Sequence, residues 1–147
     1  MSKKLWEFED KFGSISLEKC GNILLVNING ACGVDLITFY TKSVMKIAPL
    51  FGGQKWGVLY NTLGYEAATP EAEKAFVELS EICLELGCRS EVFCMTSPVA
   101  IAQASRIRLS YGNTIPIEDA IFDTPEVANA YLTKILEKLN TKSYHIN

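Results

Sequence analysis

Few residues in this sequence are suited to covalent or metal chemistry. There are five cysteines and one histidine, His145, which stands near the C-terminus. Cys83 and Cys88 have four residues between them instead of the two of a zinc knuckle, and no second such pair accompanies them, so the spacing predicts no metal site. With one histidine, a Ser-His-Asp or Cys-His catalytic system would depend on the polar tail. The pattern argues against a conventional hydrolase and predicts no catalytic residue and no cofactor.

Cys32 is the one cysteine whose surroundings suggest reactivity. It lies in the glycine-flanked segment 30–33, directly before a predicted helix that begins near Val34. The positive end of a helix lowers the pKa of a nearby thiol. Free cysteines more often behave as small hydrophobic residues, which is what we expect of Cys83 and Cys94. A small thiol enzyme that uses Cys32 is therefore kept as an alternative function.

Six polar residues are predicted to face one edge of the fold. They follow predicted strands or begin predicted helices, and ligands of open α/β sheets meet the carboxyl ends of the parallel strands. The amides of two helix N-termini there could hold an anion. The alternative is that two of the hydroxyls only cap their own helices, because each precedes a proline. The predicted partner or anion edge consists of Asn61, Thr62, Tyr65, Thr69, Thr96 and Ser97.

The elements that must position these residues alternate along the chain. Alternating apolar and polar residues on either side of Gly21 predict a β-hairpin over Ser14–Asn29. Capping residues and apolar stripes predict four helices, and short β-rich runs predict the later strands. The predicted helices are 34–48, 69–86, 97–109 and 124–139, and the later strands are 55–60, 91–95 and 119–122, with a loop over 61–68.

This order predicts a single α/β domain. Strands that alternate with helices favour right-handed crossovers and a mixed, mostly parallel sheet, here of about five strands with a leading hairpin and four helices. The length of 147 residues fits one domain. We assign 14–139 to the domain, 1–13 to an N-terminal segment and 140–147 to a polar tail.

The first predicted helix carries more apolar surface than one sheet contact requires. Beyond the stripe that faces the sheet, it has a second stripe, and a helix that is apolar on two faces is usually buried on both. The N-terminal segment with Trp6, Phe8 and Phe12, a second subunit, or a small apolar ligand could cover it. This predicted interaction face consists of Leu36, Phe39, Ile47 and Leu50.

Charge and targeting signals narrow the classes of function. Lys and Arg number 14 against 17 Asp and Glu, so there is no basic surplus for phosphate backbones and we expect no nucleic-acid partner. The N-terminus lacks the apolar stretch typical of a signal peptide, and apolar runs such as Ile23–Val26 are too short to span a bilayer. We therefore expect a cytoplasmic protein with reduced cysteines.

Several segments resemble a known family. The β-β-α opening, the strand Trp56–Tyr60, the segment Val92–Pro98 and the closing segment Ala120–Leu132 are similar to the SpoIIAA-like group of the STAS fold. The resemblance covers roughly Ser14–Leu139. This is the fold of bacterial anti-sigma-factor antagonists, so it implies the STAS architecture.

The resemblance also implies a role in protein binding. In the anti-sigma antagonists, a serine after the third strand is phosphorylated by a partner kinase, which switches protein binding. The matching stretch here begins with Asn61 and has no serine, and its aliphatic hydroxyls are Thr62 and Thr69. The fold also resembles lipid-carrying SEC14-type domains, which implies an apolar ligand as an alternative.

Together these observations predict a non-enzymatic binding or regulatory module. It would act through protein contacts at the predicted edge near Asn61–Thr69 and at the first-helix face, where self-association would give a homodimer. The alternatives are a carrier of a small apolar or lipid ligand and the thiol enzyme.

Overall fold

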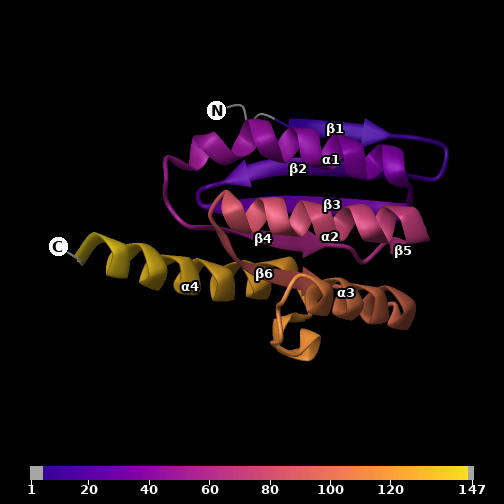
Figure 1. The fold of residues 1–147 in the computed structure, drawn as a ribbon. Coiled ribbons are helices and arrows are strands. Elements are labelled where there is room, and N and C mark those ends of the chain that lie inside the picture. Colours follow the sequence, from indigo (N-terminus) through magenta and orange to yellow (C-terminus); the bar gives the residue numbers. More distant parts are fainter. Residues whose placement is uncertain (1–4, 146–147) are drawn as a thin grey trace.

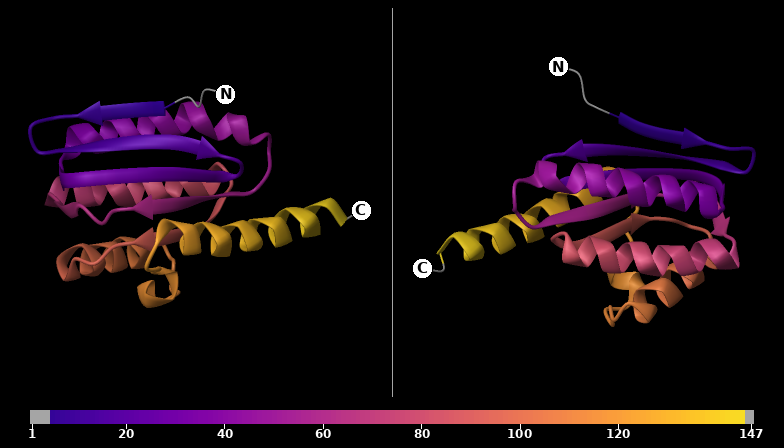
Figure 2. Two further views of the ribbon diagram at one scale, coloured as in Figure 1. Left: turned by 180° about the vertical axis from the view of Figure 1, so that it is seen from behind. Right: turned by 45° about the horizontal axis from the view of Figure 1, so that its top comes forward.

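The chain folds into one mixed β-sheet with helices on both faces. The computed structural model describes residues 5–145, with side chains through residue 141. Helices α1, α2 and α3 lie on one side of the sheet, and α4 crosses the other (Figures 1 and 2). The helices are α1 (Val34–Ile47), α2 (Pro70–Glu85), α3 (Pro98–Ser110) and α4 (Pro125–His145), with short 3-10 helices η1 (Ala48–Phe51) and η2 (Ile117–Ala120). The strands are β1 (Leu5–Glu9), β2 (Gly13–Cys20), β3 (Ile23–Cys32), β4 (Trp56–Asn61), β5 (Tyr65–Ala68) and β6 (Cys88–Cys94).

The sheet combines an antiparallel start with a parallel remainder. Its strand order is β1-β2-β3-β4-β6, and the short β5 pairs with the end of β3. The β1–β2 and β2–β3 pairs are antiparallel, whereas β3–β4, β3–β5 and β4–β6 are parallel. The predicted α/β class, leading hairpin and four helices are confirmed, in a sheet of six strands.

Local chemistry explains the element boundaries that the sequence predicts correctly. Gly21 turns the β2–β3 hairpin with a φ of 61°, a left-handed conformation that glycine adopts without strain. Thr69 and Ser97 occupy the N-cap positions of α2 and α3. Their side-chain oxygens accept hydrogen bonds from the backbone N–H of Ala72 (3.2 Å) and Ala100 (3.3 Å).

Three segments differ from the prediction. The brief strand over 119–122 is wrong: Ile117–Ala120 forms η2, because the acidic pair after Pro116 favours a helical first turn, and only Ile121 bridges Phe93. The loop over 61–68 contains β5, which forms because the end of β3 leaves a backbone edge to pair with. Helix α4 continues to His145, so a helix occupies much of the predicted tail.

The N-terminal segment contributes the edge strand β1. Its side chains alternate, with Trp6 and Phe8 half-buried on the α1 side and Glu7 and Glu9 exposed. The ring of Phe8 stacks on Phe39 of α1, with a centroid distance of 5.4 Å. The second apolar stripe of α1 is therefore partly covered by the chain itself.

Two apolar cores lie on opposite sides of the sheet. The larger one fills the space between the sheet and α1, α2 and α3, with Tyr40 and Trp56 among its fully buried side chains. The smaller one joins α4 to the other face, where Leu132 lies directly over Gly57. An added Cβ at Gly57 would lie 2.8 Å from a Leu132 methyl group, so glycine permits this close approach.

Candidate functional site

The ends of β3, β4 and β6 meet at one edge of the sheet. Thr62 follows β4, and both its backbone N–H and its hydroxyl donate to the carbonyl oxygen of Cys94 at the end of β6, over 3.0 and 3.1 Å. Asn61 donates from Nδ2 to Oδ1 of Asn27 on β3, over 3.0 Å. These strand ends, the β1–β2 turn and the first turns of α1, α2 and α3 form the carboxyl edge.

Most of the six predicted edge residues are engaged within the fold. Thr62 and Tyr65 are buried, and Asn61 and Ser97 are half-buried. The Thr69 and Ser97 hydroxyls cap their own helices, which supports the simple capping role. Thr62 is 3% exposed, so its hydroxyl is not accessible to a kinase, whereas Thr69 and Thr96 are exposed.

Large apolar side chains are exposed at the carboxyl edge instead. Phe12 is 60% exposed, Leu63 51% and Val99 65%. Main-chain hydrogen bonds tie the Phe12 turn and the Leu63–Gly64 turn to neighbouring residues of β3. Val99 stands in the first turn of α3, just after the Ser97 cap. Exposed apolar side chains on rigidly held turns are typical of interaction sites.

These three residues do not stand out as a surface in the sequence. The sequence predicts Phe12 as a possible cover for the first helix, and Leu63 and Val99 belong to no periodic apolar stripe. One signal was available: an apolar residue in a polar turn directly after a strand has no core face to enter. That reasoning identifies Leu63 without a structure.

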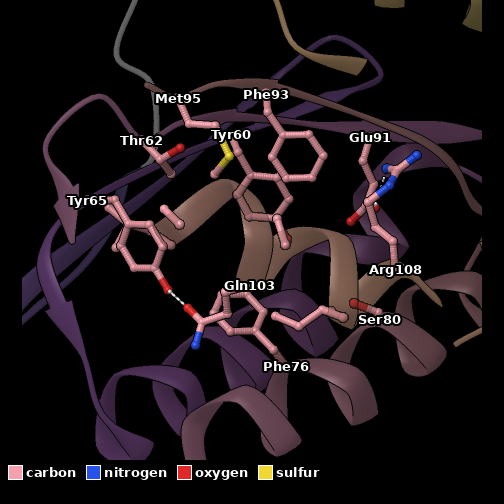
Figure 3. A pocket seen from close by; sticks show the side chains of 14 residues that line it. Tyr60, Thr62, Tyr65, Phe76, Ser80, Glu91, Phe93, Met95, Gln103 and Arg108 are labelled. Carbon is pink, nitrogen blue, oxygen red and sulfur yellow. Dashed lines mark hydrogen bonds and ion pairs between the residues drawn. The ribbon is translucent and has the colours of Figure 1, made fainter. Parts of the chain in front are cut away.

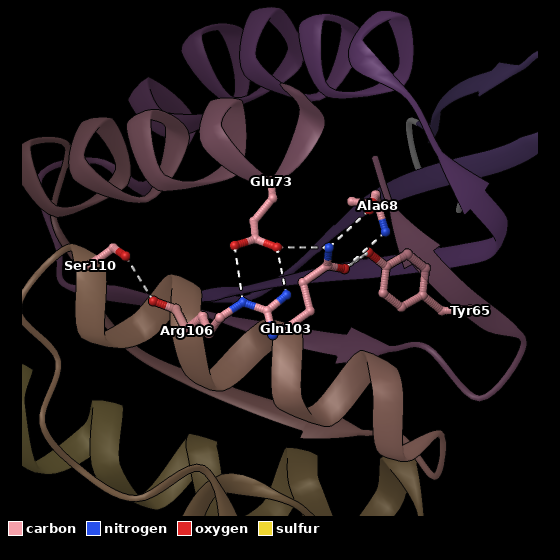
Figure 4. Close-up of polar contacts among 6 residues, drawn as sticks. All are labelled: Tyr65, Ala68, Glu73, Gln103, Arg106 and Ser110. Atoms are coloured by element: carbon pink, nitrogen blue, oxygen red, sulfur yellow. Dashed lines mark hydrogen bonds and ion pairs between the residues drawn. The ribbon is translucent and has the colours of Figure 1, made fainter. Parts of the chain in front are cut away.

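Gln103 of α3 connects the edge to the helices beside it (Figure 4). Its Oε1 accepts from the hydroxyl of Tyr65 (3.0 Å) and from the backbone N–H of Ala68 (2.8 Å). Its Nε2 donates to the Ala68 carbonyl (2.9 Å) and to Oε1 of Glu73 (3.0 Å). The amide thus bonds both backbone groups of Ala68, as a neighbouring strand would at the end of β5.

Glu73 links α2 to α3 through Arg106 (Figure 4). The Arg106 guanidinium donates from Nη2 to Oε1 over 2.8 Å and from Nε to Oε2 over 3.3 Å. This hydrogen bonding, with a further contribution from Gln103, lowers the pKa of Glu73 below its usual value near 4.5. The contacts bring together residues about 30 positions apart, so no local pattern could predict them.

A small cavity lies between the sheet, α2 and α3 (Figure 3). It encloses about 40 Å³ of free space, enough for a few water molecules. Small-molecule pockets measure roughly 300–1,000 Å³. The cavity therefore has no room for a lipid in this conformation. Its lining is mostly apolar and includes Tyr60, Tyr65, Phe76, Phe93, Met95 and Ile107.

A charged pair, buried Arg108 and half-buried Glu91, lines this cavity (Figure 3). Arg108 is 4% exposed, and its Nη1 lies 3.2 Å from Oε1 of Glu91. The Tyr111 hydroxyl also donates to Glu91, and Arg108 Nη2 donates to the Ile115 carbonyl over 3.2 Å. Burial raises the pKa of Glu91, against the opposing effects of Tyr111 and Arg108. The ion pair therefore joins α3 to β6, which is a structural role.

The predicted first-helix face is divided between core and surface. Leu36 and Ile47 are fully buried, and Phe39 is covered by Phe8. Leu50, in η1, is 56% exposed. Self-association through this face stays a prediction, and Leu50 is the one of its four residues that is openly exposed.

Cys32 lacks the properties of a reactive thiol. It is fully buried, and burial, with a smaller effect of the Asp10 carboxylate, raises its pKa to about 12. At neutral pH such a thiol stays protonated and is a poor nucleophile. Cys83 and Cys94 are buried, which confirms their assignment to the core.

Two further kinds of site, metal-binding clusters and membrane-spanning helices, can be searched for in the described residues. In residues 5–141, no three His, Cys, Asp or Glu side chains gather closely enough to hold a metal ion. Across the part of the chain that the structure describes, no helix combines the length and apolar character needed to cross a membrane.

Comparison with known proteins identifies the fold. No family model matches the chain, and no curated protein sequence matches it. The solved structure of the unphosphorylated anti-sigma factor antagonist SpoIIAA has a TM-score of 0.59 and 11% identity, over 82% of this chain and 96% of that one. An uncharacterized DUF3478-family protein from Shewanella loihica, with a SpoIIAA-like fold, has a TM-score of 0.57 and 11% identity, over 85% and 98%.

A third structure shares the architecture as part of a larger chain. SLC26A9 has a TM-score of 0.58 and 9% identity, over 81% of this chain but 21% of that one. The chain therefore has the SpoIIAA-like STAS fold, and the resemblance seen in its sequence is confirmed. At these identities the likeness establishes the fold alone.

Proposed function

We propose that this protein is a non-enzymatic binding or regulatory module that acts through protein contacts at the carboxyl edge. The observation that carries the proposal is the exposure of Phe12, Leu63 and Val99 on turns that backbone hydrogen bonds hold in place. Burying such side chains against a partner contributes roughly 25 cal/mol for each Å² of apolar surface removed from water. An anti-sigma factor antagonist shares the fold, and that role is one of protein contact.

The chemistry of the remaining residues supports binding over catalysis. The hydroxyls of Thr62, Thr69 and Ser97 cap helices or bond to the backbone, and the Cys32 thiol is buried and protonated. The five cysteines all lie among the described residues and form no disulfide, which fits a reducing compartment such as the cytoplasm.

Affinity capture with matched variants tests the proposal. The tagged wild-type chain and two triple serine variants would be incubated with extracts of the native host, and bound proteins identified by mass spectrometry. The edge variant carries Phe12→Ser, Leu63→Ser and Val99→Ser. The control variant changes equally exposed apolar residues elsewhere: Met45→Ser, Leu109→Ser and Val127→Ser.

The edge variant is expected to lose partners that the control retains. Circular dichroism would first establish that both variants fold. Retention of every partner by the edge variant, or loss of the same partners by the control, would show that binding does not use the carboxyl edge.

A further inference from the structure

The outer side of β1 is an open sheet edge. Among residues 5–145, β2 is the one strand that pairs with β1, so no strand of that range lies against the outer side of Leu5–Glu9. In Figures 1 and 2, β1 is the outermost strand of the sheet. Its sequence contains no proline, and its pairing with β2 runs without a bulge. Proline and bulges, two features that commonly block strand addition, are therefore missing from this edge, which does carry charges.

Those charges lie on one face of the strand. Glu7 and Glu9 are exposed, and their neighbours across the β1–β2 ladder are Ser16 and Ser14. Within the described part of the chain, neither carboxylate forms an ion pair. They border a shallow hollow in the sheet surface whose floor is uncharged: Ser14, Ser16, Asn27 and Asn29.

This face of the sheet is also uncovered. Helix α4 packs on β4 and β6, which leaves β1, β2 and the adjoining part of β3 bare when the molecule is seen from behind (Figure 2, left). Long side chains from an added strand would have room to lie over the two carboxylates. On the opposite face, alternate side chains of that strand would lie beside the half-buried rings of Trp6 and Phe8.

We propose that β1 accepts an additional strand from a partner protein, and that this strand alternates basic and apolar side chains. Main-chain hydrogen bonds would supply affinity, as in other cases of β-strand addition. The basic residues would face Glu7 and Glu9, and the apolar residues would continue the row of Trp6 and Phe8. This inference rests on the proposed protein-binding function and adds a second surface to it, with a stated partner chemistry.

A second copy of this chain fits the edge poorly. An antiparallel pair of β1 strands centred on Glu7 places Glu7 opposite Glu7 of the other copy. A pair centred on Phe8 places each Glu7 opposite a Glu9, and a parallel pair in register aligns all four carboxylates. Like charges directly opposite each other destabilise a strand pair, whereas opposite charges stabilise it. The edge therefore favours a basic strand.

Peptide titrations monitored by NMR test the proposal. The first probe is an eight-residue peptide that alternates lysine and valine, and the second has the same composition with four lysines followed by four valines. Each would be added to the full-length ¹⁵N-labelled protein while backbone amide shifts are followed. The protein variants are Glu7→Lys with Glu9→Lys, and a control that reverses two exposed charges of α2, Glu78→Lys with Glu81→Lys.

The alternating peptide is expected to shift the amides of Leu5–Glu9 and to bind more tightly than the block peptide. The Glu7→Lys, Glu9→Lys variant should bind the alternating peptide about tenfold more weakly, because each cross-strand charge pair contributes only modestly to the binding free energy. The control should stay within about twofold of wild type, because its charges lie on α2. All the variants share the same backbone edge, so their difference isolates the charges.

Four results would overturn the inference. The first three are equal binding of both peptides, equal weakening by both variants, and shifts confined to the carboxyl edge. The third of these would leave the proposed function standing, because the peptide would then have found Phe12, Leu63 and Val99. A wild-type dimer that dissociates on Glu7→Lys, Glu9→Lys substitution would also overturn it, by making a second copy the occupant.

Discussion

Replacing Gln103 by alanine is expected to destabilise the fold by about 3 kcal/mol. The side chain is 5% exposed, and its amide makes four hydrogen bonds, to Tyr65, Ala68 and Glu73. A neutral hydrogen bond contributes about 0.5–1.5 kcal/mol net, and one to a charged group about 1.5–3 kcal/mol. Alanine also leaves the N–H and C=O of Ala68 without these partners, while some water entry at the end of β5 offsets part of the loss.

Two further variants separate the hydrogen bonds from packing. Gln103→Met keeps a side chain of similar length and removes only the polar contacts, so a loss of about 2 kcal/mol is expected. Gln54→Ala removes the other glutamine of the chain, which is exposed and makes a hydrogen bond to Asn22, so its effect should stay below about 0.5 kcal/mol.

Urea denaturation followed by far-UV circular dichroism measures these changes. The midpoint should fall while the slope with urea stays constant, because the surface exposed on unfolding is unchanged. A cycle that combines Gln103→Met with Tyr65→Phe should give a coupling energy of about 1 kcal/mol. A Gln103→Met protein within about 0.5 kcal/mol of wild type would refute the assignment of the stability to this amide.

Three other changes follow from groups described above. Glu73 has a lowered pKa in the folded chain, so its ionised form stabilises the fold at pH values above the usual pKa near 4.5, and this stabilisation disappears as the pH falls through the lower folded-state pKa. Glu73→Gln should therefore flatten the acid side of a curve of stability against pH, measured by urea unfolding. An unchanged slope would contradict this. Cys32 is fully buried and its pKa is raised to about 12. Iodoacetamide should therefore alkylate it at neutral pH far more slowly than the half-buried Cys20, as measured by peptide mass spectrometry. Faster labelling of Cys32 would return the thiol enzyme to consideration. Gly13→Ala should cost about 2 kcal/mol, because its methyl group would overlap carbonyl oxygens of β3. Gly33→Ala has open space and a φ of −100°, so it should be close to neutral. Urea denaturation of both variants measures the difference, and equal stability of the two would count against this packing.

The parts of the fold that the sequence predicts are those decided by neighbouring residues. The turn at Gly21 and the caps at Thr69 and Ser97 depend on backbone conformation and on groups three residues away, so composition and spacing reveal them. Alternation of these elements then determines the α/β class. The same reasoning fails for β5, whose four residues become a strand only because the end of β3 lies beside them.

In the candidate site, too, local features can be predicted from the sequence, whereas contacts between distant residues cannot. The sequence places Asn61, Thr62 and Ser97 after strands, but it does not reveal that their polar groups are already engaged by the fold. The role of Gln103 depends on α3 packing beside β5, a contact across 35 residues. The exposure of Phe12 likewise becomes clear only from the structure, which places the residue in the turn between β1 and β2. From its type alone, the ring would fit equally well in a core.

The unequal cores on the two sides of the sheet imply that the protein can open in stages. Helix α4 is attached through Ala128, Leu132 and Leu136, and through Asn140, whose side chain bonds the N–H (2.9 Å) and C=O (3.2 Å) of Lys55. Releasing it exposes only the smaller core and leaves the packing of α1, α2 and α3 intact. We therefore expect α4 to open as a separate cooperative unit, whose amides exchange with solvent at a lower free energy than global unfolding requires.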